Sequence, residues 1–126
     1  MRETLVTVVG RLTGEPTPRR TSDGTTWVRF RLAVGEHRFD KETQGWVEAH
    51  VSFVSVHCWR GLGDRALATL KRGDPVVVHG RLRVHGQDQL DQGTRIDVQV
   101  EAFHLGLDLS RERPSANVAA PLAAVA

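Results

Sequence analysis

Residues 50–84 read HVSFVSVHCWRGLGDRALATLKRGDPVVVHGRLRV and predict a strand, a short helix and a second strand in that order. The two flanks, residues 50–59 and 75–84, are rich in β-branched residues that alternate with other side chains, which is typical of strands. Between them, apolar residues recur every fourth position as far as Leu70, and Gly73 supplies a helix stop. A helix of about ten residues is too short to be stable alone, so it must pack on the sheet.

Three other segments have the same strand-like composition and alternation. They are residues 4–13 (TLVTVVGRLT), 25–34 (TTWVRFRLAV) and 94–103 (TRIDVQVEAF). The chain therefore predicts three strands, one helix and two further strands. Five strands with one short helix between the third and the fourth is the order of an OB-fold, a mainly all-β fold whose strands form a five-stranded Greek-key barrel.

Two polar connections are predicted between these strands. Residues 36–47 predict a hairpin tip with Phe39 and Trp46 on its flanks, and residues 85–93 predict a loop. Val51 breaks the alternation of the third strand, so we expect that strand to be bulged near its start or to begin later. The inward-facing residues expected on the last two strands are Val76, Val78, Leu82, Val84, Ile96, Val98, Val100 and Ala102.

The length and composition fit one globular domain. The chain has 126 residues, of which 40% are hydrophobic and 25% charged, which is enough for one core and too little for two. We expect residues 1–109 to form this domain and the Ala- and Pro-rich residues 110–126 to be a disordered tail. No apolar stretch is long enough to span a membrane or to act as a secretory signal, so the sequence predicts a cytoplasmic protein.

Positive charge is concentrated in one part of the chain, although the net charge is only +2. Residues 59–83 carry six cations and two anions, whereas residues 84–112 carry two cations and six anions. Fifteen of the 17 cations are Arg, which makes bidentate and stacking contacts, although a GC-rich genome would give the same bias. A basic face is therefore compatible with a nearly neutral protein.

Alternation turns one set of aromatic and basic side chains away from the core. On the second, third and fourth predicted strands this set is Trp27, Arg29, Arg31, Phe53, Ser55, His57, Trp59, His79, Arg81 and Arg83, with Arg38 and Phe39 on the hairpin beside it. Aromatic rings stack on bases of any sequence, and cations follow the phosphate backbone. The pattern thus favours binding of single-stranded nucleic acid.

Two other interpretations of this set are open. An OB-fold barrel with an aromatic face could instead be a protein-interaction module, in which Trp27 or Trp46 fills a subunit contact. Phe30 and Phe103 are expected in the core or in an interface. A preference for single-stranded RNA is also compatible with the sequence, because nothing in it identifies a device that senses the 2′-hydroxyl.

Several motifs, taken in order, resemble the bacterial single-stranded DNA-binding protein family over about residues 4–107. The motifs are Val8-Val9-Gly10-Arg11-Leu12-Thr13, Phe30-Arg31-Leu32-Ala33, Phe39-Asp40-Lys41, Val56-His57-Cys58-Trp59-Arg60, Lys71-Arg72-Gly73 and Val77-Val78-His79-Gly80-Arg81-Leu82. The hairpin and the Trp59-Arg60 pair resemble the actinobacterial branch. The resemblance implies a homotetramer without a cofactor that binds single-stranded DNA in replication, recombination or repair, in the cytoplasm at the nucleoid.

The resemblance also implies roles for individual residues. Phe53 and Trp59 match two stacking positions on the third strand, the hairpin stacking position falls at Arg38 or Phe39, and Arg83 matches a phosphate contact. Together with the alternation, this gives a predicted DNA-binding set of Trp27, Arg29, Arg31, Arg38, Phe39, Phe53, Trp59, Arg60, Arg81 and Arg83.

Two departures from the family pattern affect the expected affinity and partners. No aromatic residue follows the fourth strand in His85-Gly86-Gln87-Asp88, so one stacking position is missing and weaker binding is expected. The sequence closes on Pro121-Leu122-Ala123-Ala124-Val125-Ala126 in place of the family's acidic tip. We therefore do not expect the protein to recruit replication and repair proteins. We expect it to be a specialised paralogue of the family.

Metal and catalytic sites have little support in the sequence. His57 and Cys58 are adjacent on a strand and point to opposite faces, so they cannot ligate one metal, and no paired His or Cys motif is present. No nucleophile lies in a recognisable activating setting, so an enzyme is not expected. Cys58 is expected to be a buried apolar residue or, in a homo-oligomer, one half of an intersubunit disulfide.

Overall fold

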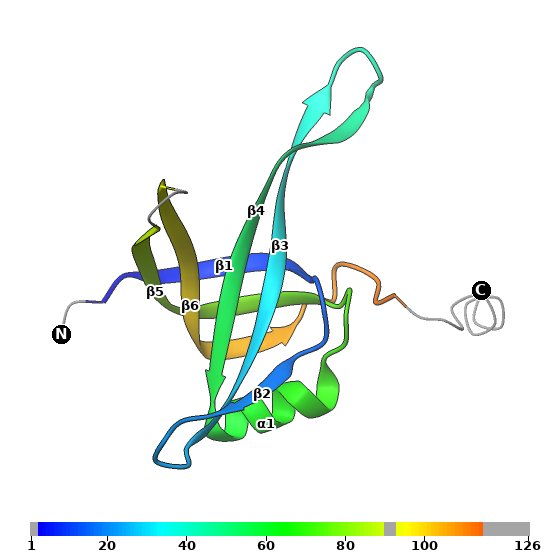
Figure 1. The fold of residues 1–126 in the computed structure, drawn as a ribbon. Coiled ribbons are helices and arrows are strands. Elements are labelled where there is room, and N and C mark those ends of the chain that lie inside the picture. Colours follow the sequence, from blue (N-terminus) through cyan, green and yellow to red (C-terminus); the bar gives the residue numbers. More distant parts are fainter. Residues whose placement is uncertain (1–2, 90–92, 115–126) are drawn as a thin grey trace, which may run out of the picture.

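The structure is a computed structural model that describes residues 3–89 and 93–114 (Figure 1). Within these ranges the elements are β1 (Leu5–Leu12), β2 (Thr17–Arg20), β3 (Thr26–Asp40), β4 (Gly45–Trp59), α1 (Arg60–Thr69), β5 (Pro75–Gln89) and β6 (Gly93–Leu107). The described part of the chain has no helix that is both long and apolar enough to cross a membrane.

The sheet closes into a barrel. Its strands are hydrogen-bonded in the order β1-β5-β6-β4-β3-β2, and β1 also pairs with β3 at Arg11 and Leu12 (Figure 1). The pairing of β4 with β6 is parallel, and the other strand pairs are antiparallel. The strands β1, β3, β4, β6 and β5 therefore form a closed ring, with α1 connecting β4 to β5. This arrangement confirms the predicted five-stranded OB-fold barrel.

The strands are longer and more numerous than the sequence predicted. β2 is an additional strand at the edge of the sheet, where Pro18 pairs with Val28 and its missing N–H costs no ladder bond. The predicted hairpin tip is mostly strand, since β3 and β4 stay paired to Asp40 and Gly45 and project beyond the barrel (Figure 1). Most of the predicted loop 85–93 is likewise strand, because β5 and β6 remain paired along it.

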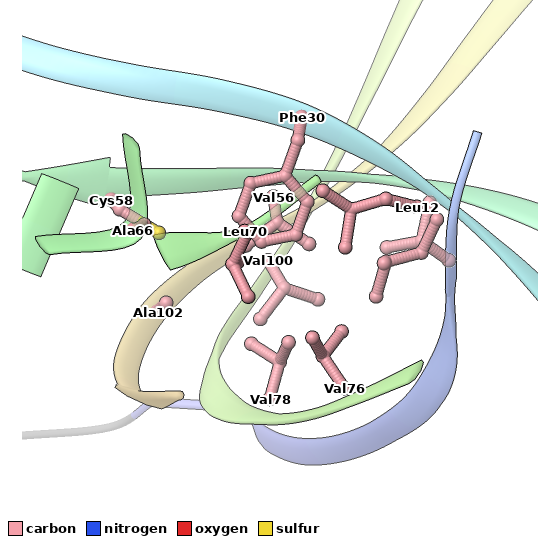
Figure 2. Packing of buried hydrophobic residues seen from close by; sticks show 12 residues of the cluster. Leu12, Phe30, Val56, Cys58, Ala66, Leu70, Val76, Val78, Val100 and Ala102 are labelled. Atoms are coloured by element: carbon pink, nitrogen blue, oxygen red, sulfur yellow. The ribbon is translucent and has the colours of Figure 1, made fainter. Parts of the chain in front are cut away.

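The core fills the inside of the barrel with the residues that alternation turned inward. Figure 2 shows Phe30 projecting from one wall toward the valines of the opposite wall, with Leu70, the residue that follows α1, beside it. The buried set is Leu12, Phe30, Leu32, Val54, Val56, Cys58, Ala66, Leu70, Val76, Val78, Val100 and Ala102. The predicted bulge near Val51 is confirmed, because Ala49 is skipped where the β3–β4 register shifts.

Two residues that were predicted to face inward, Val84 and Ile96, are exposed. Both lie where β5 and β6 continue past the barrel: β5 pairs with β1 only up to Arg81, and β6 pairs with β4 only from Gln99. No described strand lies across from the distal part of this hairpin, so its inner face has nothing to pack against.

The first residues of the predicted tail pack on the barrel instead of leaving it. Arg113 donates through Nε and Nη2 to the carboxylate oxygens of Asp74, at 3.1 and 2.9 Å. Asp74, which is 1% exposed, also accepts from the backbone N–H of Lys71 at 2.9 Å. Arg11 donates to the carbonyl of Glu112 at 3.1 Å. Residues 115–126, the rest of the predicted tail, lie outside the described residues.

We expect Asp74→Asn to lower the free energy of unfolding near neutral pH and to lose this effect in acid. Burial opposes ionisation of Asp74, but the bonds from Arg113 and Lys71 outweigh it and hold the pKa below its usual 3.8. A carboxyl with a lowered folded-state pKa contributes stability above its unfolded pKa, and this contribution disappears as the pH falls through the folded value. Urea unfolding should show a loss of about 1–2 kcal/mol at neutral pH. An equal loss at a pH well below the folded-state pKa of Asp74 would contradict this role.

Candidate nucleic-acid interface

The outward side chains of β3, β4, β6 and β5 form a continuous surface, which we call the strand face. Its residues are Trp27, Arg29, Arg31, Phe53, Ser55, His57, Trp59, Arg81, Arg83, Asp97, Gln99 and Glu101, of which Ser55 is buried by its neighbours. The strand registers arrange eight of them in two rows that run across the four strands. One row is Arg29, His57, Glu101 and Arg81, and the next is Arg31, Ser55, Gln99 and Arg83. Both rows therefore begin and end on an arginine.

Three rings gather at the α1 end of the strand face. Trp27 and Trp59 are direct cross-strand partners and stack with their centroids 5.4 Å apart and their planes at 28°. The ring of His57 lies 4.7 Å from that of Trp27. Burial, aided by the positive charge of Arg29, lowers the pKa of His57 from 6.5, so the imidazole contributes a neutral ring at pH 7.

A second aromatic position lies further along β4. The side chain of Phe53 is 51% exposed, and the guanidinium of Arg31 lies 5.1 Å from the centroid of its ring. This cation–π contact places a flat aromatic surface and a positive charge side by side in solvent. A base stacked on the ring would carry its phosphate close to the guanidinium.

The projecting hairpin of β3 and β4 carries a third aromatic group. Phe39 and Trp46 are cross-strand partners whose rings meet edge to face at 5.8 Å and 78°. Trp46 is 72% exposed, and Arg38 precedes the pair on β3. The predicted binding set included Arg38 and Phe39 but omitted Trp46. The hairpin register places Trp46 directly opposite Phe39, and a prediction of this register would have added Trp46 to the binding set.

Several arginines of the strand face already have partners within the protein. Arg81 pairs with Glu3 at 2.6 Å and lies 3.6 Å from Glu101, while Arg83 lies 3.7 Å from the same Glu101 oxygen. Oε2 of Glu101 is buried without a hydrogen-bond partner among the described residues. Since Arg83 is about half exposed, it is the better placed of the two to reach a phosphate.

Arg29 is held by a second polar network. It donates to Oγ of Ser55 at 3.2 Å, and Ser55 in turn donates to Asp97 at 3.4 Å. Gln99 donates to the other carboxylate oxygen of Asp97 at 2.7 Å. This bond, with the charge of Arg29, lowers the pKa of Asp97 against the effect of burial, so the carboxylate stays ionised. The strand face therefore contains acids among its arginines.

Residues 4–107 match the model of the Single-strand binding protein family. The chain belongs to this family. Among its relatives, Single-stranded DNA-binding protein 2 of Streptomyces avermitilis is 39% identical over 121 residues, which cover 92% of this chain and 75% of the relative. Single-stranded DNA-binding protein 1 of Streptomyces coelicolor is 38% identical over 111 residues, covering 88% of this chain and 70% of the relative.

Solved structures of family members have the same fold. The small single-stranded DNA-binding protein from Streptomyces coelicolor superposes with a TM-score of 0.79 at 36% identity, covering 89% of this chain and all 100% of that one. The second single-stranded DNA-binding protein from Mycobacterium smegmatis gives 0.66 at 30% identity, covering 91% and 98%. These relatives confirm the predicted resemblance to the family. The family is described as one of binding proteins, which agrees with the prediction that the protein is not an enzyme.

The structure brings most of the predicted binding set of this family member together. Trp27, Arg29, Arg31, Phe53, Trp59, Arg81 and Arg83 lie on the strand face, and Arg38 and Phe39 lie on the hairpin that continues it. Arg60 lies at the first position of α1 with a left-handed φ of 53°. His79 lies elsewhere: its Nδ1 is 2.9 Å from the hydroxyl oxygen of Thr7, its partner on β1, and its ring stacks at 6.2 Å on His104.

The lone cysteine lies inside the barrel. Cys58 has no exposed surface, and burial raises the pKa of its thiol to about 12. An intersubunit disulfide would therefore require β4 to separate from the core. Within the described ranges, no three His, Cys, Asp or Glu residues are grouped so as to hold a metal.

Proposed function

We propose that this member of the family binds single-stranded DNA without sequence preference. The observation that carries the proposal is the strand face, where stacked or exposed rings alternate with arginines on adjacent strands. Rings accept any base, and a duplex hides the base faces that the rings would need. The names of the relatives support DNA as the ligand.

In this proposal each aromatic group receives one or more bases. Trp59 with Trp27, then Phe53, then Phe39 with Trp46 form a series of stacking positions from α1 to the hairpin tip. Arg31, Arg38 and Arg83 lie beside this series and would neutralise phosphates. Arg29 and Arg81, which are engaged by Ser55, Glu3 and Glu101, would mainly hold the face in shape.

We extend the proposal to a homotetramer that acts in replication, recombination or repair at the nucleoid. Support for assembly comes from β1, which pairs with β5 from Leu5 to Arg11 but meets β3 only at Arg11 and Leu12. The outward side chains of Leu5 and Val9 on this strand are exposed. A strand edge and apolar side chains of this kind suit association with a second copy.

The direct test is titration of the intrinsic tryptophan fluorescence with oligo-dT, with a matched duplex and with oligo-U, at low and moderate salt. Strong quenching by oligo-dT, little by duplex, and weakening by salt are expected. Equal or stronger quenching by oligo-U would make the ligand RNA. A folded protein that shows no quenching at low salt would overturn the proposal in favour of a protein-interaction module.

We expect Arg83→Ala to reduce the salt dependence of binding. If Arg83 contacts one phosphate of a single strand, its loss lowers the slope of log K against log salt by about 0.7. The matched control is Arg65→Ala, which removes an exposed arginine of α1 outside the strand face. Equal slopes for Arg83→Ala and Arg65→Ala would exclude Arg83 from the interface.

A further inference from the structure

An open hollow of about 800 Å³ lies at the α1 end of the barrel and adjoins the strand face. Trp59 and Phe103 supply aromatic surface to it, and Leu62 and Ala102 supply aliphatic surface. Its remaining lining includes Arg60 and Glu101 together with residues of the 21–25 turn. Trp59 and Glu101 also line the shallow depression next to Arg83, so the hollow continues the strand face.

Phe103 lies at an irregularity of the β5–β6 pairing, two residues after Glu101 and on the same side of β6. His79 pairs with His104 and Gly80 pairs with Ala102, so Phe103 is left without a partner on β5. Its side chain, for which a place in the core or an interface is expected, is 39% exposed. Glu101 of β6 pairs with His57 of β4 in parallel register. Two residues further along, Phe103 on β6 and Trp59 on β4 lie at corresponding positions.

Phe103 is supported in the same way as Phe53 on the strand face. The guanidinium of Arg81 lies 5.6 Å from the centroid of its ring, and Arg81 is itself fixed by Glu3 and Glu101. The ring is thus backed on one side by a restrained cation and faces the hollow that Trp59 also lines.

The charges of the hollow favour a base over a phosphate. Bonds from the Thr21 hydroxyl and the Thr25 N–H hold the pKa of Asp23 at about 2, so this carboxylate is ionised at neutral pH. Glu101 contributes a second carboxylate to the lining. Two carboxylates repel a phosphate but not a neutral nucleobase. Their oxygens can also accept hydrogen bonds from N–H groups on the edge of the base. Arg60 supplies the positive charge at the same hollow.

We propose that this hollow is an additional nucleobase site, in which Phe103 and Trp59 provide aromatic walls and Arg60 contacts the adjoining phosphate. The inference rests on the proposed binding of single-stranded DNA and extends the bound strand past Trp59, around the α1 end of the barrel. It assigns a stacking role to Phe103 that compensates for the aromatic residue missing after the fourth predicted strand.

The test compares Phe103→Leu with Phe103→Trp by titration with oligo-dT long enough to cover the strand face and the hollow. Leucine keeps an apolar side chain of similar size, whereas tryptophan keeps the stacking surface. We expect Phe103→Leu to weaken binding about fivefold or more and Phe103→Trp to bind at least as tightly as the wild type. Arg60→Gly, in which glycine accepts the left-handed φ, should remain folded and also bind more weakly.

The outcomes separate this site from the function on which it rests. If the wild-type protein does not bind oligo-dT, the proposed function fails. If the wild type binds and Phe103→Leu, folded by circular dichroism, binds equally well, the hollow is not a base site. Should Phe103→Leu fail to fold, unchanged affinity of the folded Arg60→Gly variant would overturn the site, and a several-fold loss in Arg60→Gly with affinity retained in Phe103→Trp would support it.

Discussion

Replacing Gly80 by alanine will destabilise the barrel by about 3–5 kcal/mol or prevent folding. A Cβ atom at this position would lie 2.0 Å from the carbonyl oxygen of Glu101 and within 2.9 Å of Cα of Ala102. These atoms belong to the backbone of β6 and cannot rotate away, so β5 and β6 would have to separate at the register shift. Guanidinium unfolding of the purified variant, followed by far-UV circular dichroism, measures the effect.

Gly14→Ala is the matched control for this prediction. No atom lies within 4 Å of a Cβ built at Gly14, and its φ is not left-handed. The variant should therefore unfold within about 0.5 kcal/mol of the wild type. Similar stabilities for Gly80→Ala and Gly14→Ala would mean that β5 and β6 do not approach as closely as described.

Trp59→Ala is expected to weaken binding of single-stranded DNA by about 1–3 kcal/mol, or roughly 5- to 150-fold. Trp59 stacks on Trp27 on the strand face and also lines the hollow beside Phe103, so its loss would affect two of the proposed base positions. Because Trp59→Ala removes one of the fluorescent side chains, binding is best followed by the anisotropy of a labelled oligo-dT.

Trp59→Phe serves as the control, since it keeps a ring at this position. It should retain most of the affinity, while both variants should remain folded because the core lies on the opposite face of β4. A folded Trp59→Ala variant with wild-type affinity would remove Trp59 from the interface.

The barrel could be predicted because alternation along a strand is a local property. Phe30, Val56 and Val78 lie at the expected spacing on three strands, and all three are buried. The same argument placed Trp27, Arg29 and Phe53 on one outward face. It predicted no strand at β2, a four-residue edge strand in which Pro18 is acceptable because of its position at the edge of the sheet.

Features that depend on contacts between distant segments could not be predicted from alternation. Asp97 and Glu101 lie among the arginines because β6 pairs in parallel with β4, a pairing that no local pattern encodes. Phe103 faces solvent on the same side of β6 as Glu101, but the extra residue that β6 has opposite Gly80 leaves it without a partner on β5, which no local pattern shows. Including Trp46 in the binding set required knowledge of the hairpin register, which pairs it with Phe39. That register depends on a turn in which Gln44 adopts a left-handed φ of 57°.

The carboxylates among the arginines have a consequence for the speed of exchange. In the proposed complex, a phosphate that leaves Arg83 would be replaced by the carboxylate of Glu101, which lies 3.7 Å from the guanidinium, so no unpaired charge would be left behind. At Arg83 the departing contact would thus be replaced by one inside the protein, which would lower the barrier to dissociation more than the barrier to association. We therefore expect bound strands to have short residence times, so that another protein can take over the exposed strand quickly.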